Sequence, residues 1–172
     1  MLKKDDTTRS ICSFDNAEEI GQWVSVNDNV MGGLSEGVAS LTHDSCLQFS
    51  GTVSLENNGG FASIRTLPKE FNLCEFNGLR IRVKGDGRAY QFRIRTDGKY
   101  DGIAFKHDFS TDPSDWIEID LPFASFLPTF RGRILRDVKP LVAAEIRQIG
   151  FFVADKVAGP FSLIVDEITA FK

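Results

Sequence analysis

Short segments in which apolar and polar residues alternate, separated by glycine-containing turns, recur along almost the whole chain. A period of two places the apolar side chains on one face of a β-strand. We expect a strand in each of residues 10–14, 37–42, 46–53, 61–66, 78–84, 89–96, 102–109, 116–121, 147–154 and 161–171. Helical signal is limited to a capping pattern at Asp15-Asn16-Ala17-Glu18 and to one turn at 141–145. The sequence therefore predicts an all-β sandwich or barrel with one or two short helices.

One pair of these segments predicts a β-hairpin with a defined register. Asp86-Gly87 stands between residues 79–84 and 89–95, and Asp-Gly is favoured where a two-residue turn needs positive φ at both central positions. A turn centred there places apolar side chains opposite one another on one face, with Val83 opposite Tyr90, Ile81 opposite Phe92 and Leu79 opposite Ile94. We therefore expect this face to lie in the core.

The other face of the same pair is basic, and carries Arg80, Arg82, Arg93 and Arg95. Like charges directly opposite each other are unfavourable, so an acidic group should lie nearby. Two explanations are open. Carboxylates of a neighbouring strand, such as Glu118 and Asp120, pair with the arginines, or the basic face contacts a ligand.

Composition excludes several classes of protein. The 172 residues, 42% hydrophobic and 26% charged, fit one folded domain, which we place at residues 10–172 after a flexible polar segment, residues 1–9. The net charge of −4 argues against a nucleic-acid partner, which would need a basic surface. No stretch approaches the roughly 20 apolar residues of a membrane span, and no apolar run of a secretory signal follows the first lysines. We therefore expect a cytoplasmic protein with no direct membrane span.

The distribution of metal-binding and nucleophilic residues predicts neither a metal site nor a cofactor. The 3 cysteines and 2 histidines lack the short spacings of ligand pairs. No phosphate-binding loop or serine-nucleophile motif occurs, so we expect no catalytic residue. A structural calcium ion held by Asp28, Asp155 and Asp166 is an open alternative, because carboxylates and backbone carbonyls are the ligands that calcium prefers.

Two turns combine paired glycines with polar side chains. Residues 28–35 include Asp28, Asn29 and Met31, and residues 56–61 include Asn57 and Asn58. Paired glycines permit positive φ, and Asp or Asn side chains can bond back to the backbone. Either the turns are purely structural, or these five residues face a cleft and hold a peptide or a polyhydroxylated ligand.

A loop rich in phenylalanine and proline follows the segment at 116–121. We expect Phe123, Phe126 and Phe130 to cover the core, and Arg131 and Arg133 to point to solvent on either side of Gly132. An arginine guanidinium recognises a carboxylate or phosphate through two parallel hydrogen bonds. The two arginines are therefore either candidate anion-binding residues or partners in loop salt bridges.

Together these segments resemble the family of mitochondrial respiratory complex I intermediate-associated proteins, which are assembly factors, and its bacterial and plastid relatives. The resemblance covers most of the chain, and rests on residues 23–35, 49–61, 90–96, 116–132 and 149–168. Its most specific pieces are Val30-Met31-Gly32-Gly33 and Asn57-Asn58-Gly59-Gly60-Phe61, in this order.

The resemblance implies a galactose-binding-like β-sandwich of the jelly-roll type, similar to carbohydrate-binding modules. It also implies a non-catalytic assembly or chaperone-like factor, whose partners are proteins of a respiratory or photosynthetic membrane complex or of its assembly intermediates. We expect a stand-alone bacterial member, because the chain lacks the long N-terminal extension of a mitochondrial one. The alternative is a domain that binds a glycan through aromatic side chains, for which the candidates are Trp23, Tyr100 and Trp116.

Overall fold

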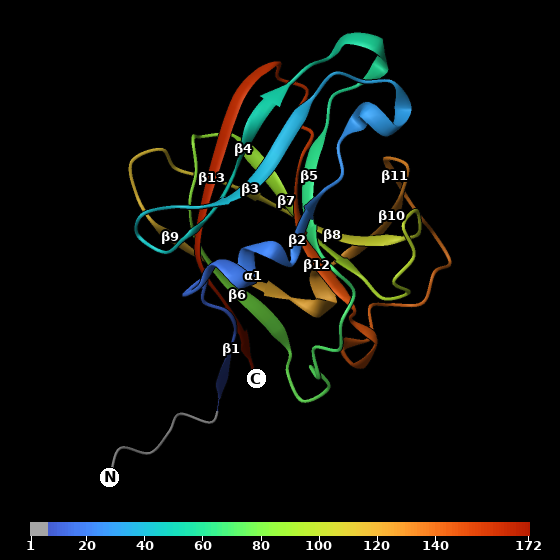
Figure 1. Ribbon diagram of the computed structural model, residues 1–172. Helices are drawn as coiled ribbons and strands as arrows, with labels where there is room; N and C mark the ends of the chain where they lie inside the picture. Colours follow the sequence, from blue (N-terminus) through green and yellow to red (C-terminus); the bar gives the residue numbers. More distant parts are fainter. Residues whose placement is uncertain (1–6) are drawn as a thin grey trace.

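The computed structural model describes residues 7–172, and their strands form two antiparallel sheets that face each other (Figure 1). The first sheet has the order β3 (Glu36–Leu41), β4 (Leu47–Val53), β13 (Gly159–Phe171), β6 (Gly78–Lys84) and β9 (Ile117–Pro122), with β1 (Thr8–Cys12) also paired to β13. The second sheet has the order β11 (Arg133–Ile134), β10 (Leu127–Phe130), β8 (Ala104–Ser110), β7 (Ala89–Arg95), β12 (Gln148–Val153), β5 (Ala62–Thr66) and β2 (Trp23–Ser25). The predicted all-β sandwich is confirmed.

Within residues 7–172 helical structure is confined to one α-helix and four single turns. The helix α1 (Ala17–Gly21) follows Asn16, whose side chain accepts a hydrogen bond from the Glu19 amide, so the predicted short helix is confirmed with its cap one residue later. The turns are η1 (Asp28–Met31), η2 (Glu56–Asn58), η3 (Phe123–Ser125) and η4 (Ala143–Glu145). The last of these lies in the segment expected to form a helical turn at 141–145.

Every predicted strand is present, with its ends shifted by no more than two residues. β1 begins at Thr8 and its backbone pairs with the C-terminal half of β13, so residues 8 and 9 of the segment predicted to be flexible lie in a strand. Residues 1–6 of that segment lie outside the described residues. The short strands β2, β10 and β11 were not predicted, since two to four residues with little alternation carry no periodic signal.

The two sheets bury their facing sides in one apolar core. Leu79, Ile81 and Val83 of β6 point into it from the first sheet, and Tyr90, Phe92 and Ile94 of β7 point into it from the second. All of these side chains are at most 1% exposed. The prediction that both segments turn their apolar face to the core is therefore confirmed.

The predicted hairpin between these two segments is wrong, because β6 and β7 belong to different sheets. β6 pairs with β13 and β9, whereas β7 pairs with β8 and β12. Of the two residues expected to form the turn, Gly87 has positive φ and Asp86 does not, which excludes type I′ geometry. Residues 85–88 instead carry the chain across the core from one sheet to the other.

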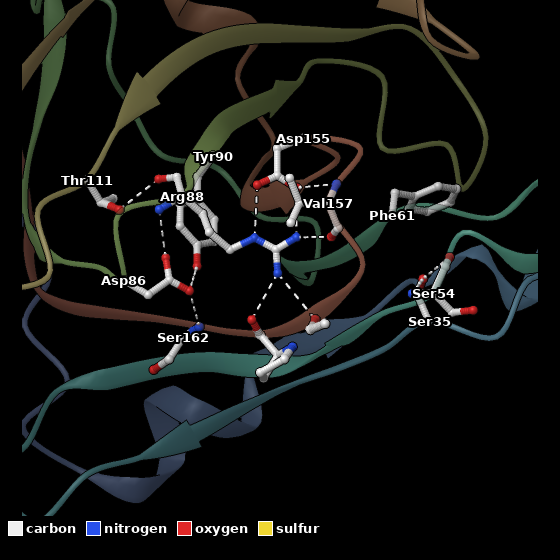
Figure 2. Close-up of polar contacts among 12 residues, drawn as sticks. Ser35, Ser54, Phe61, Asp86, Arg88, Tyr90, Thr111, Asp155, Val157 and Ser162 are labelled. Atoms are coloured by element: carbon white, nitrogen blue, oxygen red, sulfur yellow. Dashed lines mark hydrogen bonds and ion pairs between the residues drawn. The ribbon is translucent and has the colours of Figure 1, made fainter.

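Polar contacts that reach across the sandwich hold this crossover in place (Figure 2). The Asp86 carboxylate accepts hydrogen bonds from the Arg88 amide, the Tyr90 hydroxyl and the Ser162 amide. The Arg88 guanidinium binds both oxygens of Asp155, at 2.7 and 2.9 Å, and donates to main-chain carbonyls in residues 157–160. Both side chains of the pair are nearly buried, so Arg88 joins the crossover to the chain that links β12 to β13.

The basic residues of β6 and β7 have separate environments as a result. On the first sheet Arg80 forms an ion pair with Asp120 at 2.5 Å, and Arg82 forms one with Asp166 at 2.7 Å. Pairing with carboxylates therefore explains these two arginines. Arg93 and Arg95 lie on the outer face of the second sheet, away from those acids, and for them contact with a ligand stays a prediction.

Candidate functional site

The outer face of the second sheet is hollowed into a cleft of about 740 Å³. Its floor is made by the outward-facing residues of β5, β7 and β12, which are neighbouring strands in the sheet. Its walls come from the turns η1 and η2 on one side and from residues 100–102 and 129–132 on the other. The cleft is thus built from segments far apart in the sequence.

Arginines and a glycine form one row across the floor. Arg65 of β5 and Arg93 of β7 are both register partners of Gly150 in β12, so the two arginines flank a residue that has no side chain. A Cβ on Gly150 would lie 2.4 Å from the Ile64 carbonyl oxygen, which is closer than any real contact. Arg95 lies in the next row, opposite Gln148. The glycine leaves the floor open between the guanidinium groups.

Each of the three arginines is held by neutral groups. The Arg93 guanidinium lies 3.6 Å from the centre of the Phe152 ring and donates to Oε1 of Gln91. Arg95 donates to the Gly102 carbonyl and Arg65 to the carbonyl of residue 100. Within residues 7–172 none of the three forms an ion pair, and the carboxylates of residues 97, 101 and 108 act on them only at longer range.

Burial and mutual repulsion weaken the protonated state of these arginines. Desolvation, together with the nearby Arg95 charge, lowers the pKa of Arg93 to about 10. Desolvation also lowers the pKa of Arg65, and the pKa of Arg95 falls through desolvation and the Arg65 charge. With a pKa of about 10, Arg93 stays protonated near neutral pH, so the floor carries positive charge that no ion pair within residues 7–172 balances directly.

The wall formed by η1 and η2 is organised around one buried carboxylate. Asp28 accepts hydrogen bonds from the amides of Ser35 at 2.9 Å, Gly60 at 2.7 Å and Phe61 at 3.2 Å. A Cβ on Gly33 or Gly59 would lie within 2.6 Å of the same carboxylate, so only glycine fits at these positions. Burial alone would raise the pKa of Asp28, but the hydrogen bonds outweigh it and hold the pKa below its ordinary range. Asp28 therefore joins the two Gly-Gly turns.

The opposite wall contains a tight hairpin between β10 and β11. Its two turn residues, Arg131 and Gly132, both have positive φ, as a type I′ turn requires. Arg131 is exposed and pairs with Asp101 at 3.1 Å, so the expected loop salt bridge is present. Phe130 lines the cleft, whereas Phe123 and Phe126 cover the core as predicted.

The structure brings together some of the predicted binding residues and separates others from them. Those that line the cleft are Met31, Asn58, Arg93, Arg95 and Arg131. Those that are not among its lining residues are Asp28, Asn29, Asn57 and Arg133. The two glycine-rich turns and the arginine loop thus border one cleft, and binding by any of these residues stays a prediction.

The alternative ligand sites predicted from the sequence are dispersed. Asp28 is bonded to backbone amides, Asp155 to Arg88 and Asp166 to Arg82, so the three acids do not form the calcium site considered above. No cluster of three potential metal ligands occurs in the described part of the chain. Of the candidate aromatic residues, Trp23 is buried in the core, Trp116 stacks on Arg82, and Tyr100 alone lines the cleft.

The polar floor residues Arg65, Gln91 and Gln148 were not among the predicted binding residues. Arg65 and Gln91 stand at alternate, outward positions in segments that were predicted as strands, so their outward direction was readable. Their meeting was not, because it depends on the strand order β7-β12-β5. Gln148 donates to the Thr66 carbonyl, and its Oε1 has no hydrogen-bond partner within residues 7–172.

The sequence is similar to those of known proteins over most of its length. A family model described as Complex I intermediate-associated protein 30 matches residues 12–165. Complex I intermediate-associated protein 30, mitochondrial, of Mus musculus is 32% identical in an alignment 190 residues long, which covers 96% of this chain and 57% of the mouse protein. The Neurospora crassa protein of the same name is 27% identical over 72% of this chain and 50% of its own length. The chain thus spans about half the length of these curated relatives.

Solved structures show the same fold at low sequence identity. A family 11 carbohydrate-binding module from Clostridium thermocellum, solved in complex with a β-1,3-1,4-mixed-linked tetrasaccharide, has a TM-score of 0.74 at 19% identity, covering 96% of this chain and 95% of the module. An agarase has a TM-score of 0.65 at 9% identity, over 96% of this chain and 25% of the enzyme. These likenesses confirm the predicted jelly-roll type of β-sandwich.

Within residues 7–172 no helix is both long enough and apolar enough to cross a lipid bilayer.

Proposed function

The chain belongs to the Complex I intermediate-associated protein 30 family, and on that premise we propose that it is a non-catalytic binding domain in the assembly of a respiratory or photosynthetic membrane complex. Family membership over residues 12–165 is the observation that carries the proposal. Its partners would be protein subunits of the complex or of its assembly intermediates.

The cleft supports a binding role, because its side chains are of kinds that recognise rather than react. Its floor presents guanidinium groups that stay protonated near neutral pH, together with the amides of Gln91 and Gln148. Its rim adds the apolar side chains of Val30, Met31 and Leu55. This combination suits a partner that offers both charge and apolar surface.

Deletion in the source organism tests the assembly role. We expect the amount of the mature membrane complex, measured on native gels, to fall and its assembly intermediates to accumulate, because an assembly factor acts before the complex is complete. Re-expression of the chain should restore the complex. A complex that forms at the normal rate and amount without this chain would contradict the proposal.

We further propose that the protein acts in the cytoplasm, on the side of the membrane from which subunits are added. Cell fractionation with antibodies against the chain tests this location. Recovery outside the cytoplasmic and peripheral-membrane fractions would contradict it.

A glycan-binding role is the second candidate, and the ring of Tyr100 in the cleft is the observation that favours it. The ring is 62% exposed, and sugar recognition uses flat aromatic side chains. The other two candidate aromatic residues lie elsewhere, and the further rings of the cleft, Phe61, Phe130 and Phe152, are half-buried against arginines or one another. A glycan array probed with the folded chain would show binding to neutral polysaccharides under this alternative, and none under the assembly role.

A further inference from the structure

In the described part of the chain, the arginines of the cleft floor lack the carboxylate partners that several other arginines have. Arg80, Arg82 and Arg88 each bind a carboxylate at 2.5 to 2.7 Å. Arg65 and Arg93 share one row of the floor and Arg95 lies in the next, yet within residues 7–172 none of these three has an ion-pair partner. Burying a positive charge without a counter-charge is costly, so this arrangement favours an anionic group supplied from outside.

The floor also has space and unused donors for that group. Gly150 places no side chain between its register partners Arg65 and Arg93. Only glycine fits there, because any side chain would collide with the Ile64 carbonyl. Each guanidinium carries five N–H donors, and the hydrogen bonds of Arg65 and Arg95 use one donor each. The remaining donors can bind a carboxylate through two parallel hydrogen bonds.

The rim shows which kind of molecule would carry the anion. Val30, Met31 and Leu55 are 56%, 67% and 46% exposed at the edge of the cleft. Aliphatic side chains and a flexible methionine adapt to the apolar side chains of a peptide. A sugar would need free aromatic faces, and the rings that line the cleft already lie against arginines or against one another: Phe152 against Arg93, Tyr100 against Arg65, Phe130 against Arg131 and Phe61 against Phe152. The cleft therefore fits a peptide better than an acidic oligosaccharide.

We propose that the cleft binds an acidic segment of a protein partner, in which an aspartate or glutamate carboxylate lies among Arg65, Arg93 and Arg95 and neighbouring apolar side chains contact Val30, Met31 and Leu55. This proposal deepens the proposed function and rests on it for the nature of the partner. Charge complementarity selects the segment, because three guanidinium groups without an ion pair in residues 7–172 attract a carboxylate. The apolar rim selects the residues that flank that carboxylate.

Selection of short random peptides displayed on phage, with the folded chain as bait, tests this proposal. We expect the selected peptides to be enriched in Asp or Glu next to apolar residues, and their affinity to fall as salt is added, since the contact is electrostatic. R93Q and R95Q should each weaken a selected peptide by about tenfold or more, because each removes a charge-assisted contact. R133Q is the matched control, because it removes the same charge from an exposed position outside the lining of the cleft.

Several results would overturn the proposal. The first is that the selected peptides show no enrichment in acidic residues. The second is that the R93Q, R95Q and R133Q variants bind a selected peptide with equal affinity. The third is that no peptide is selected, whereas an acidic oligosaccharide such as oligogalacturonate binds. Thermal melts of all variants show whether a loss of binding reflects a loss of folding, and a Glu-to-Gln change in the selected peptide gives the same test without altering the protein.

The outcomes separate this proposal from the proposed function. Peptide binding through the arginines, combined with normal complex assembly in the deletion strain, would leave the acidic-peptide site standing and refute the assembly role. Impaired assembly without acidic-peptide binding would refute the site alone.

Discussion

Replacing Asp28 by asparagine should separate the two glycine-rich turns that form one wall of the cleft. The carboxylate accepts three main-chain N–H groups, one on Oδ1 and two on Oδ2. An amide can rotate to keep its oxygen toward Gly60 and Phe61, but its NH2 group then faces the Ser35 N–H. One charge-assisted hydrogen bond is lost and two become neutral, so we expect the free energy of unfolding to fall by about 2–4 kcal/mol.

Urea unfolding at pH 7 measures this loss, with Asp44→Asn as the matched control. Asp44 is exposed, so the same chemical change there should alter stability by no more than about 0.5 kcal/mol. Because a domain of this kind has only about 5–15 kcal/mol of stability, the Asp28 variant should unfold at clearly lower urea. If both variants unfold at the wild-type concentration, the reasoning that Asp28 joins the turns is refuted.

Three further predictions follow from buried contacts. Arg88→Met leaves the Asp155 carboxylate buried without its partner and should cost about 3–5 kcal/mol in urea unfolding; a loss below about 1 kcal/mol would contradict the role of this pair. Gly150→Ala places a Cβ 2.4 Å from a carbonyl oxygen and should lower the free energy of unfolding by about 1–3 kcal/mol. Gly21→Ala is the control, because a Cβ there meets no atom and the residue lies in a helix. Equal melting temperatures of the two variants would refute the predicted difference. Bonding to Arg88 lowers the pKa of Asp155, and hydrogen bonds lower that of Asp28 against its burial. The stabilisation by these two carboxylates is fully present above about pH 4, the unfolded-state pKa, and is lost as pH falls through their lower folded-state pKa values. The melting temperature should therefore decrease when the pH is lowered below about 4, and this decrease should be smaller for Asp28→Asn.

The strands were predictable because each local pattern of alternation matched one buried face. Leu79, Ile81 and Val83 alternate along β6 and all lie in the core, as their spacing indicated. Strand pairing was less predictable, because a turn sequence does not reveal whether the chain folds back within one sheet or crosses to the other. Asp86-Gly87 marks a crossing, and the type I′ turn stands at Arg131-Gly132, where the sequence signal is weaker.

The cleft was predictable in its parts and not in its arrangement. Met31, Asn58 and Arg131 stood out as turn or loop residues, and they do line the cleft. Arg65 was not predicted as a binding residue, because the sequence does not show the strand order that places it in one row with Arg93. One of the two alternatives for Asp28 was that it faces a ligand. Its carboxylate instead accepts hydrogen bonds from backbone amides, which come together only when the two turns fold.

The proposed binding role requires that a partner protein contact the outer face of the second sheet. Photo-crosslinking in the source organism tests this most directly, with a photoreactive amino acid placed at Tyr100 in the cleft wall or at Glu118 on the first sheet. Both positions are exposed. We predict that position 100 crosslinks to a subunit of the membrane complex and that position 118 does not. Crosslinks from position 118 alone would place the partner on the opposite sheet and contradict the account.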